Sequence, residues 1–146
     1  SGNLHNTSDA FRSDLQTKSD YGLRMETRSD CPIACTLDLI GDRWSLLILR
    51  ALFIGKRRYG EFLGMPEKIS TNILANRLAA LIDNGIIDRS AYSLRPARYE
   101  YRLTVKGADL LGVMQQMTGW AEKHLPGLAM PPESFVMASA AEFYPK

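Results

Sequence analysis

Apolar residues recur at steps of three and four along much of the chain, which is the period of an amphipathic α-helix. This pattern predicts helices over residues 32–40, 43–53, 59–63 and 70–84, and a long final helix after Thr104. Pro32 suits a first helical turn, Asp42 is a candidate N-cap, and Gly41 and Gly55 suit the ends of their helices. The segment 43–53 is apolar almost all round, so we expect it to lie at the centre of the domain.

The segment 70–84 has one apolar face and one face of small polar side chains. Ser70 is a good N-cap, and Gly85 is a good stop signal. The apolar face carries Leu74, Leu78, Leu81 and Ile82. The opposite face carries Thr71, Asn72, Ala75, Asn76 and Ala79. Such a face can approach the DNA major groove closely, although it also suits an ordinary surface helix.

The periodicity changes from helix to strand after Gly85. Two short runs rich in β-branched and aromatic residues, at 86–92 and 99–103, are separated by residues 93–98, which we expect to form a loop. A hairpin that follows two helices joined by a tight turn predicts a winged helix-turn-helix. The fold class is therefore mainly α with a small β-hairpin wing. The final helix has more apolar surface than so small a core needs, which favours a dimer interface.

Composition divides the chain into a central domain and two extensions. Residues 1–30 are polar, with one possible short helix around Phe11 and Leu15. The domain is expected over 31–125, and residues 126–146 form a C-terminal extension that either packs locally or crosses to a partner. An apolar fraction of 45% in 146 residues is enough for one core.

The charge distribution says more than the net charge of +2. Residues 50–106 hold eleven Lys or Arg against five acids, so the middle of the chain is basic. No apolar run reaches the roughly 18 residues of a membrane span, and no signal peptide is evident, so we expect a cytoplasmic protein. We find no phosphate-binding loop, nucleophile elbow or metalloprotease motif, and therefore expect neither an enzyme nor a bound cofactor.

The candidate DNA contacts fall into two groups. Thr71, Asn72 and Asn76 are candidates for base contacts, because an amide can pair with adenine and a threonine methyl can touch thymine. The phosphate-contact candidates are Lys56, Arg57, Arg58, Lys68, Ser70, Arg77, Arg95 and Arg98. For Arg77 an internal ion pair is as good an interpretation, since it lies near the buried stripe.

Cys31 is the one residue with candidate chemistry beyond DNA binding. It stands at a predicted helix N-terminus with Arg28 nearby, which favours the thiolate and its reaction with oxidants or electrophiles, while Asp30 opposes this. The alternative is a small buried thiol. Cys35 is expected in the core, since a disulfide across four residues at a helix start is strained. The spacing of the two cysteines does not suit zinc, and His5 and His124 lie apart, so no metal site is expected.

The chain resembles the HxlR-type winged helix-turn-helix transcriptional regulators from Cys31 to about Leu125. The resemblance rests on the order and spacing of several short motifs. These are Cys31-Pro32, Gly41-Asp42-Arg43-Trp44, Leu49-Arg50-Ala51-Leu52, Arg58-Tyr59-Gly60-Glu61-Phe62, Ile69-Ser70 with Leu74, Arg77 and Leu78, and Tyr99-Glu100-Tyr101-Arg102-Leu103-Thr104 with Gly107. Tyr59 and Tyr99 depart from the residues usual in the family.

The resemblance implies a homodimer, formed by the first and last helices, that binds a pseudo-palindromic DNA operator and regulates transcription. We expect a repressor, and some similar regulators use a cysteine at the position of Cys31 to sense oxidants, quinones or aldehydes. Two alternatives stay open. One is control by a small-molecule inducer in a pocket near Trp44, Met114 and Trp120, and the other is a protein-interaction module that does not bind DNA.

Overall fold

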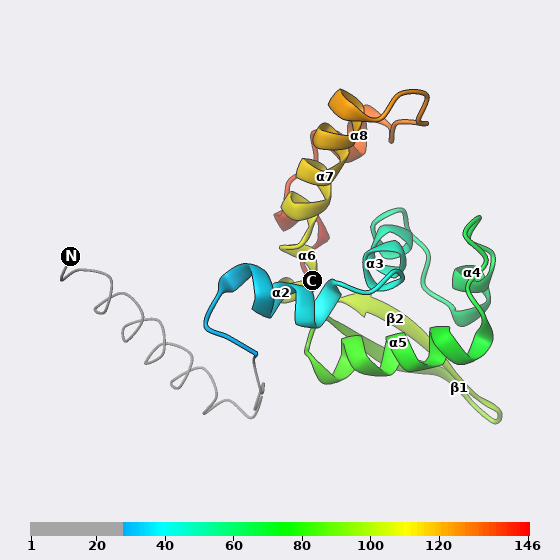
Figure 1. Cartoon of the computed structure of the whole chain (residues 1–146). Helices are drawn as coiled ribbons and strands as arrows, with labels where there is room; N and C mark the ends of the chain where they lie inside the picture. Colours follow the sequence, from blue (N-terminus) through cyan, green and yellow to red (C-terminus); the bar gives the residue numbers. More distant parts are fainter. Residues whose placement is uncertain (1–27) are drawn as a thin grey trace. The chain divides into compact units, whose positions relative to one another are not determined.

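The computed structural model describes residues 28–146, and the possible helix around Phe11 and Leu15 lies outside them. The described residues form two compact units that divide after Asp42. The first unit contains α2 (Pro32–Ile40), which begins with its proline and is followed by Gly41 at the C-cap, as the sequence predicts. The second unit, 43–146, contains the remaining elements (Figure 1).

Together with the hairpin and the later helices, three helices of the second unit contribute to its core. They are α3 (Ser45–Phe53), α4 (Tyr59–Leu63) and α5 (Thr71–Asp83). The buried side chains come from all three, including Leu49 and Leu52 of α3, Phe62 of α4 and Leu78 of α5. The predicted start of α3 is wrong: the helix begins at Ser45 with Trp44 at the N-cap position, and residues 42–44 form bends. Asp42 is therefore too far upstream to cap it.

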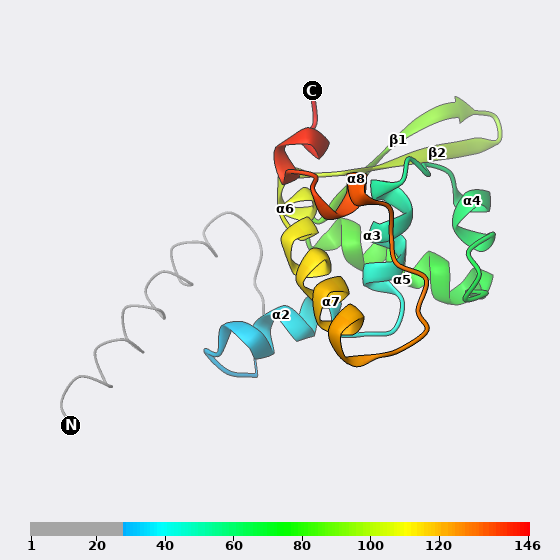
Figure 2. The same ribbon diagram turned by 90° about the horizontal axis from the view of Figure 1, so that it is seen from above.

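The hairpin consists of β1 (Ile87–Leu94) and β2 (Ala97–Leu103), paired antiparallel. Ile87 lies opposite Leu103, Leu94 lies opposite Ala97, and a bulge falls at Tyr92. The expected loop over 93–98 is therefore wrong, because cross-strand pairing extends to Leu94 and leaves only two residues at the turn. The hairpin projects from the body of the unit in both views (Figures 1 and 2).

The predicted long final helix is two helices, α6 (Val105–Ala108) and α7 (Leu111–His124). The Thr104 hydroxyl accepts a hydrogen bond from the N–H of Gly107 at 3.1 Å and donates one to the carbonyl of Gly85 at 2.6 Å. Gly107 lies so close to the carbonyl of Ile86 that a Cβ there would stand 2.0 Å from the oxygen. The first turn is thus fixed against the start of the hairpin, and the helix is interrupted at Asp109 and Leu110.

The C-terminal extension packs on its own unit. It contains α8 (Glu133–Val136) and a 3₁₀ helix, η1 (Ala140–Phe143). Phe53 of α3 meets the rings of Phe135 and Phe143 edge to face, with centroids 6.4 and 4.9 Å apart. The hydroxyl of Tyr144 donates to Asp109 Oδ1 at 2.5 Å. Figure 2 shows this segment running back past α3 toward the base of the hairpin.

Candidate nucleic-acid interface

Helix α5, called the recognition helix below, presents the polar face that the sequence predicts. Its N-cap is Ser70, whose hydroxyl accepts a hydrogen bond from the N–H of Ile73 at 3.3 Å. Thr71, Asn72 and Asn76 are all exposed, whereas Leu74, Leu78 and Leu81 are buried. Ile73 is also 41% exposed and adds an apolar contact point to this face. The helix can therefore offer two amides and small methyl groups to a flat surface.

Arg77 lies beside this face and is half-buried. Its Nη2 donates to Oδ1 of Asn76 at 2.6 Å. The contact holds the Asn76 amide in place, because a charge-assisted hydrogen bond is stronger than one between neutral groups. The structure thus places the Arg77 guanidinium beside a predicted base-contact residue.

Two contacts attach the start of the recognition helix to the core. The hydroxyl of Tyr59 in α4 donates to the carbonyl of Thr71 at 2.7 Å. The guanidinium of Arg50 in α3 forms an ion pair with both carboxylate oxygens of Glu67, and its hydrogen bond lowers the pKa of that carboxyl. The turn into α5 is therefore held from two sides. Lys68, within this turn, is exposed and has a positive φ of 59°.

The basic corner, Lys56 to Arg58, does not act as three equivalent surface cations. Arg57 Nη1 donates to the carbonyls of Leu52 and Lys56, both at 2.8 Å, so this side chain satisfies the C-terminal end of α3. The Glu61 carboxylate accepts hydrogen bonds from the backbone N–H groups of Arg57 and Arg58, and these bonds hold its pKa below the usual value. Lys56 Nζ stands 4.0 Å from the same carboxylate.

Arginines stack on tyrosines along the hairpin, which we call the wing (residues 87–103). The guanidinium of Arg58 lies 4.1 Å from the ring centroid of Tyr92 and 3.3 Å from the Glu100 carboxylate. That of Arg89 lies 4.0 Å from the ring centroid of Tyr99. Such stacking orders long cationic side chains while their charge stays available to a solvent-side partner.

A surface depression of about 400 Å³ lies between the start of α4 and the wing. Its lining includes Arg58, Arg98 and three tyrosines, Tyr92, Tyr99 and Tyr101. Arg95 at the turn and Arg98 at the start of β2 are both exposed. The structure therefore brings Arg58 and Arg98 together, from segments forty residues apart in sequence. A depression lined by two arginines is suited to a phosphate group, which would compete with Glu100 for Arg58.

Sequence reasoning misses several residues of this surface. It does not single out Arg89 and Tyr92, because they stand three residues apart and the period-two pattern of a strand does not place them on one face. The Arg50–Glu67 pair carries no local signal, because its partners lie on separate elements. Tyr59 stands out in the sequence only for its departure from the family pattern, yet its hydroxyl reaches the recognition helix.

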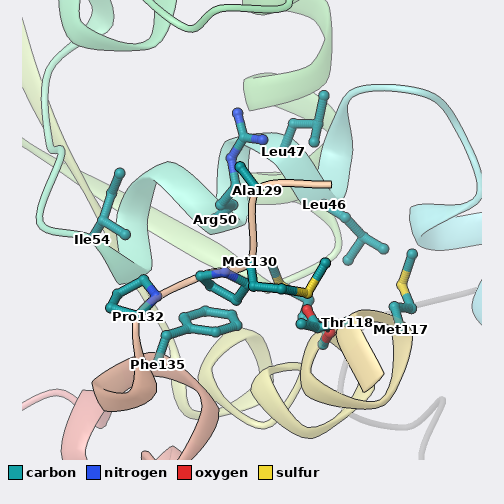
Figure 3. A pocket seen from close by; sticks show the side chains of 12 residues that line it. Leu46, Leu47, Arg50, Ile54, Met117, Thr118, Ala129, Met130, Pro132 and Phe135 are labelled. Carbon is teal, nitrogen blue, oxygen red and sulfur yellow. Dashed lines mark hydrogen bonds between the residues drawn. The ribbon is translucent and has the colours of Figure 1, made fainter. Parts of the chain in front are cut away.

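The predicted ligand-pocket residues are not brought together. Met114 lines a cavity between α3, α7 and residues 129–135, whereas Trp44 and Trp120 are not part of its lining (Figure 3). Trp120 is 60% exposed on α7, with its ring 5.1 Å from that of His124. Within residues 28–146 no group of His, Cys, Asp or Glu side chains could hold a metal ion, and His5 lies outside this range.

Cys31 is exposed at the N-cap of α2, and Cys35 is half-buried; both are free thiols. The N–H of Cys31 donates to the hydroxyl of Ser29 at 3.2 Å, and Sγ of Cys35 lies 3.2 Å from the Ser29 carbonyl oxygen. The guanidinium of Arg28 pairs with Asp38 at 2.8 Å. Arg28, the cation expected to favour the Cys31 thiolate, is therefore paired with the Asp38 carboxylate.

No helix in the described part of the chain has both the length and the apolar character needed to cross a membrane.

The sequence profile of the HxlR-like helix-turn-helix family matches residues 39–128, more than half of the chain. An uncharacterized HTH-type transcriptional regulator of Mycobacterium tuberculosis is 40% identical over 117 residues, which cover 78% of this chain and 70% of that protein.

Two solved structures of redox-related regulators are also similar. The reduced form of the transcriptional regulator YodB from Bacillus subtilis has a TM-score of 0.57 and 36% identity, over 67% of this chain and 98% of that one. The redox regulator HypR in its oxidized form has a TM-score of 0.59 and 33% identity, over 66% and 100% of the two chains. These relatives confirm the predicted family, the mainly helical winged fold and the expectation of a non-enzyme. The chain belongs to the HxlR-like helix-turn-helix family of transcriptional regulators.

Proposed function

We propose that this protein is a dimeric repressor that binds a pseudo-palindromic DNA operator. The observation that carries the proposal is the exposed small-residue face of the recognition helix, next to the arginines of the wing. The helix enters the major groove, where Thr71, Asn72 and Asn76 contact base edges. The wing lies against the phosphate backbone. This arrangement divides sequence recognition and affinity between two elements.

The phosphate contacts are shared among the cations around the helix. Arg58 and Arg98 hold one phosphate at their common depression, and Arg95 reaches a neighbouring one from the turn. Lys56 and Lys68 are exposed and act as weaker point charges. Ser70 stands at the N-terminus of α5, where the positive end of the helix dipole favours an anion. Arg57 and Arg77 contribute less directly, because each is half-buried and hydrogen-bonded within the protein. Arg58 also contacts Glu100, but 53% of its side chain stays exposed.

The dimer interface uses apolar side chains that the helices leave exposed. On α7 these include Val113, Met117 and Trp120, which recur at helical spacing on one side. On α2, Ile33 and Leu37 are 72% and 53% exposed. We assign both helices to a two-fold interface. Two recognition helices about 34 Å apart would then enter successive major grooves on one side of the duplex.

Arg98→Ala tests the wing directly. We expect operator affinity to fall about threefold to tenfold, and the slope of log affinity against log salt to become shallower by about one. Both effects follow from the loss of one phosphate contact. The measurement is fluorescence anisotropy of labelled operator DNA at four or more salt concentrations. Lys123→Ala, which removes an exposed cation near the end of α7 and outside the wing, serves as the matched control.

Two results would contradict this part of the proposal. An unchanged salt slope for Arg98→Ala would mean that the wing does not contact phosphate. A chain that binds no DNA at any salt concentration would instead favour the protein-interaction alternative. Genomic fragments next to the gene supply the DNA for the first measurements, because regulators commonly act on adjacent promoters.

We further propose that oxidation or electrophile modification of Cys31 controls DNA binding. The thiol is exposed, and the similar proteins include a redox regulator, HypR. YodB has also been solved in a diamide-treated form. In the oxidised form the two Cys31 thiols of a dimer form one disulfide. They lose two protons and two electrons, which an oxidant such as diamide accepts to become the hydrazine.

Cys31→Ser separates this control from control by a ligand. After diamide treatment we expect a disulfide-linked dimer of the unmodified protein on non-reducing electrophoresis, and a monomer for Cys31→Ser. Cys35→Ser is the matched control and should still form the dimer, because its thiol is half-buried within one protomer. A monomer for the unmodified protein, or a dimer for Cys31→Ser, would refute the intersubunit disulfide.

A further inference from the structure

The C-terminal extension supplies one wall of an open apolar pocket, called the cavity below. Residues 129–135 pass across α3 and α7 and leave a cavity of about 400 Å³ (Figure 3). The family profile ends at residue 128, so this side of the cavity lies beyond the matched part of the chain. A volume of this size falls within the range of small-molecule sites in proteins.

The lining is almost entirely apolar. Of the twelve residues that line the cavity, only Arg50 and Thr118 are polar. Both have partners: the Arg50 guanidinium is paired with Glu67, and the Thr118 hydroxyl donates to the Met114 carbonyl at 3.0 Å. A charged ligand would have to break the Arg50 ion pair or remain unpaired, which is costly in an apolar site. The chemistry of the lining therefore favours a neutral molecule.

Three methionines and one phenylalanine shape the inside of the cavity. Met117 and Met130 carry flexible thioethers that adapt to an occupant, and their sulfur atoms make favourable contacts with aromatic rings. Phe135 adds an aromatic face, and Figure 3 shows these side chains grouped on one side of α3. We propose that the cavity binds a neutral, largely apolar small molecule with at least one aromatic ring.

The extension is anchored firmly enough to form a lasting wall. The side-chain amide of Gln115 in α7 lies within hydrogen-bond distance of the carbonyls of Phe135, Val136 and Ala138, at 3.0, 3.1 and 2.9 Å. Phe53 packs against Phe135 at the same place. All the lining residues thus belong to one protomer, and the cavity opens to solvent near Met117, which also borders the proposed dimer face of α7.

The cavity also reaches the turn that leads into the recognition helix. Arg50 lines the cavity, and its guanidinium pairs with Glu67, three residues before the N-cap Ser70. An occupant that shifts Arg50 changes how this turn is held, and so affects DNA binding. This consequence rests on the proposed function, whereas the binding of the ligand itself does not.

Binding is tested with the full chain and the neutral fluorescent probe N-phenylnaphthylamine, without DNA. We expect a saturable rise in fluorescence with one probe bound per chain. Met130→Arg places a charge in the cavity and should weaken binding about tenfold or more. The matched control is Met137→Arg, because Met137 is 75% exposed and lies outside the cavity lining. Thermal unfolding shows whether each variant is folded.

A second variant covers the case in which Met130→Arg does not fold. Ala129→Trp fills the cavity with an uncharged side chain and should also abolish saturable binding. Equal probe binding by the folded variants and the unmodified chain would overturn the proposal. The proposal would also be overturned if the probe bound at low protein concentration but not at concentrations where the protein dimerises, since a second copy would then cover the cavity. Failure to bind DNA leaves these results unchanged, because no DNA is present.

Discussion

Gly107→Ala should destabilise the domain by about 3 kcal/mol or more, the largest stability loss that we expect from a single methyl group. The added Cβ would stand 2.0 Å from the carbonyl oxygen of Ile86 and 3.1 Å from its carbon. Both atoms belong to the backbone, so no side-chain rotation can relieve the contact. The same backbone carbonyl of Ile86 is a hydrogen-bond acceptor for the N–H of Thr104, so its displacement weakens this bond too.

Chemical denaturation followed by circular dichroism measures the loss for Gly107→Ala. Gly112→Ala is the matched control, because Gly112 also lies in a helix but a methyl group added there would meet no atom within 4 Å. Alanine is the better helix former, so this control should be neutral or more stable by up to about 1 kcal/mol. A similar stability for both variants would show that α6 does not pack this closely on Ile86.

Replacing Asn72 and Asn76 by alanine should cost the most in operator recognition. An amide that pairs with adenine is worth about 1–3 kcal/mol of discrimination, so each change should weaken specific binding about tenfold to a hundredfold. Binding to unrelated DNA should change little, because the arginines around the helix supply the affinity that does not depend on sequence. The ratio of the two affinities is therefore the quantity to measure.

The control for these variants is Glu122→Ala, which removes an exposed polar side chain from α7, on the side of this helix away from the proposed dimer interface. It should leave both affinities unchanged. A parallel fall in specific and unspecific binding for Asn72→Ala and Asn76→Ala would show that these side chains do not contact bases. The recognition helix would then act in positioning only.

Elements determined by local chemistry could be predicted from the sequence. Pro32 at the start of α2, Gly41 at its end and the Ser70 cap of α5 each act within one helical turn, and each is found where expected. The bounds of α4, Tyr59–Leu63, agree with the predicted helix at both ends. In these segments the residues that start, cap or end a helix lie within a few positions of the helix end that they determine.

Features determined by distant contacts could not be predicted. The final helix is interrupted after Ala108 because its first turn is fixed against Ile86, twenty-one residues before Gly107. The hairpin turn is shorter than expected because pairing between Leu94 and Ala97 extends the strands. The hydrophobic periodicity of one segment contains no information on which distant residue that segment will contact, so neither the contact with Ile86 nor the strand pairing could be predicted from it.

The candidate site shows the same division. The exposure of Thr71, Asn72 and Asn76 agrees with the predicted polar face, since it follows from helix geometry. The roles of the basic residues do not follow from composition. Arg57 binds the end of α3, whereas Arg58 joins Arg98 at the wing, although the two arginines are adjacent in sequence. The base and phosphate contacts themselves remain predictions.

Phe53 of α3 is covered by aromatic side chains of the C-terminal extension. Its ring is buried, and its aromatic neighbours Phe135 and Phe143 both lie beyond the part of the chain that the family profile matches. A relative without this extension would expose a large aromatic ring at the position of Phe53. Selection would then favour a smaller or more polar side chain there. The residue at this one position should therefore indicate, from sequence alone, which family members carry a similar C-terminal cover.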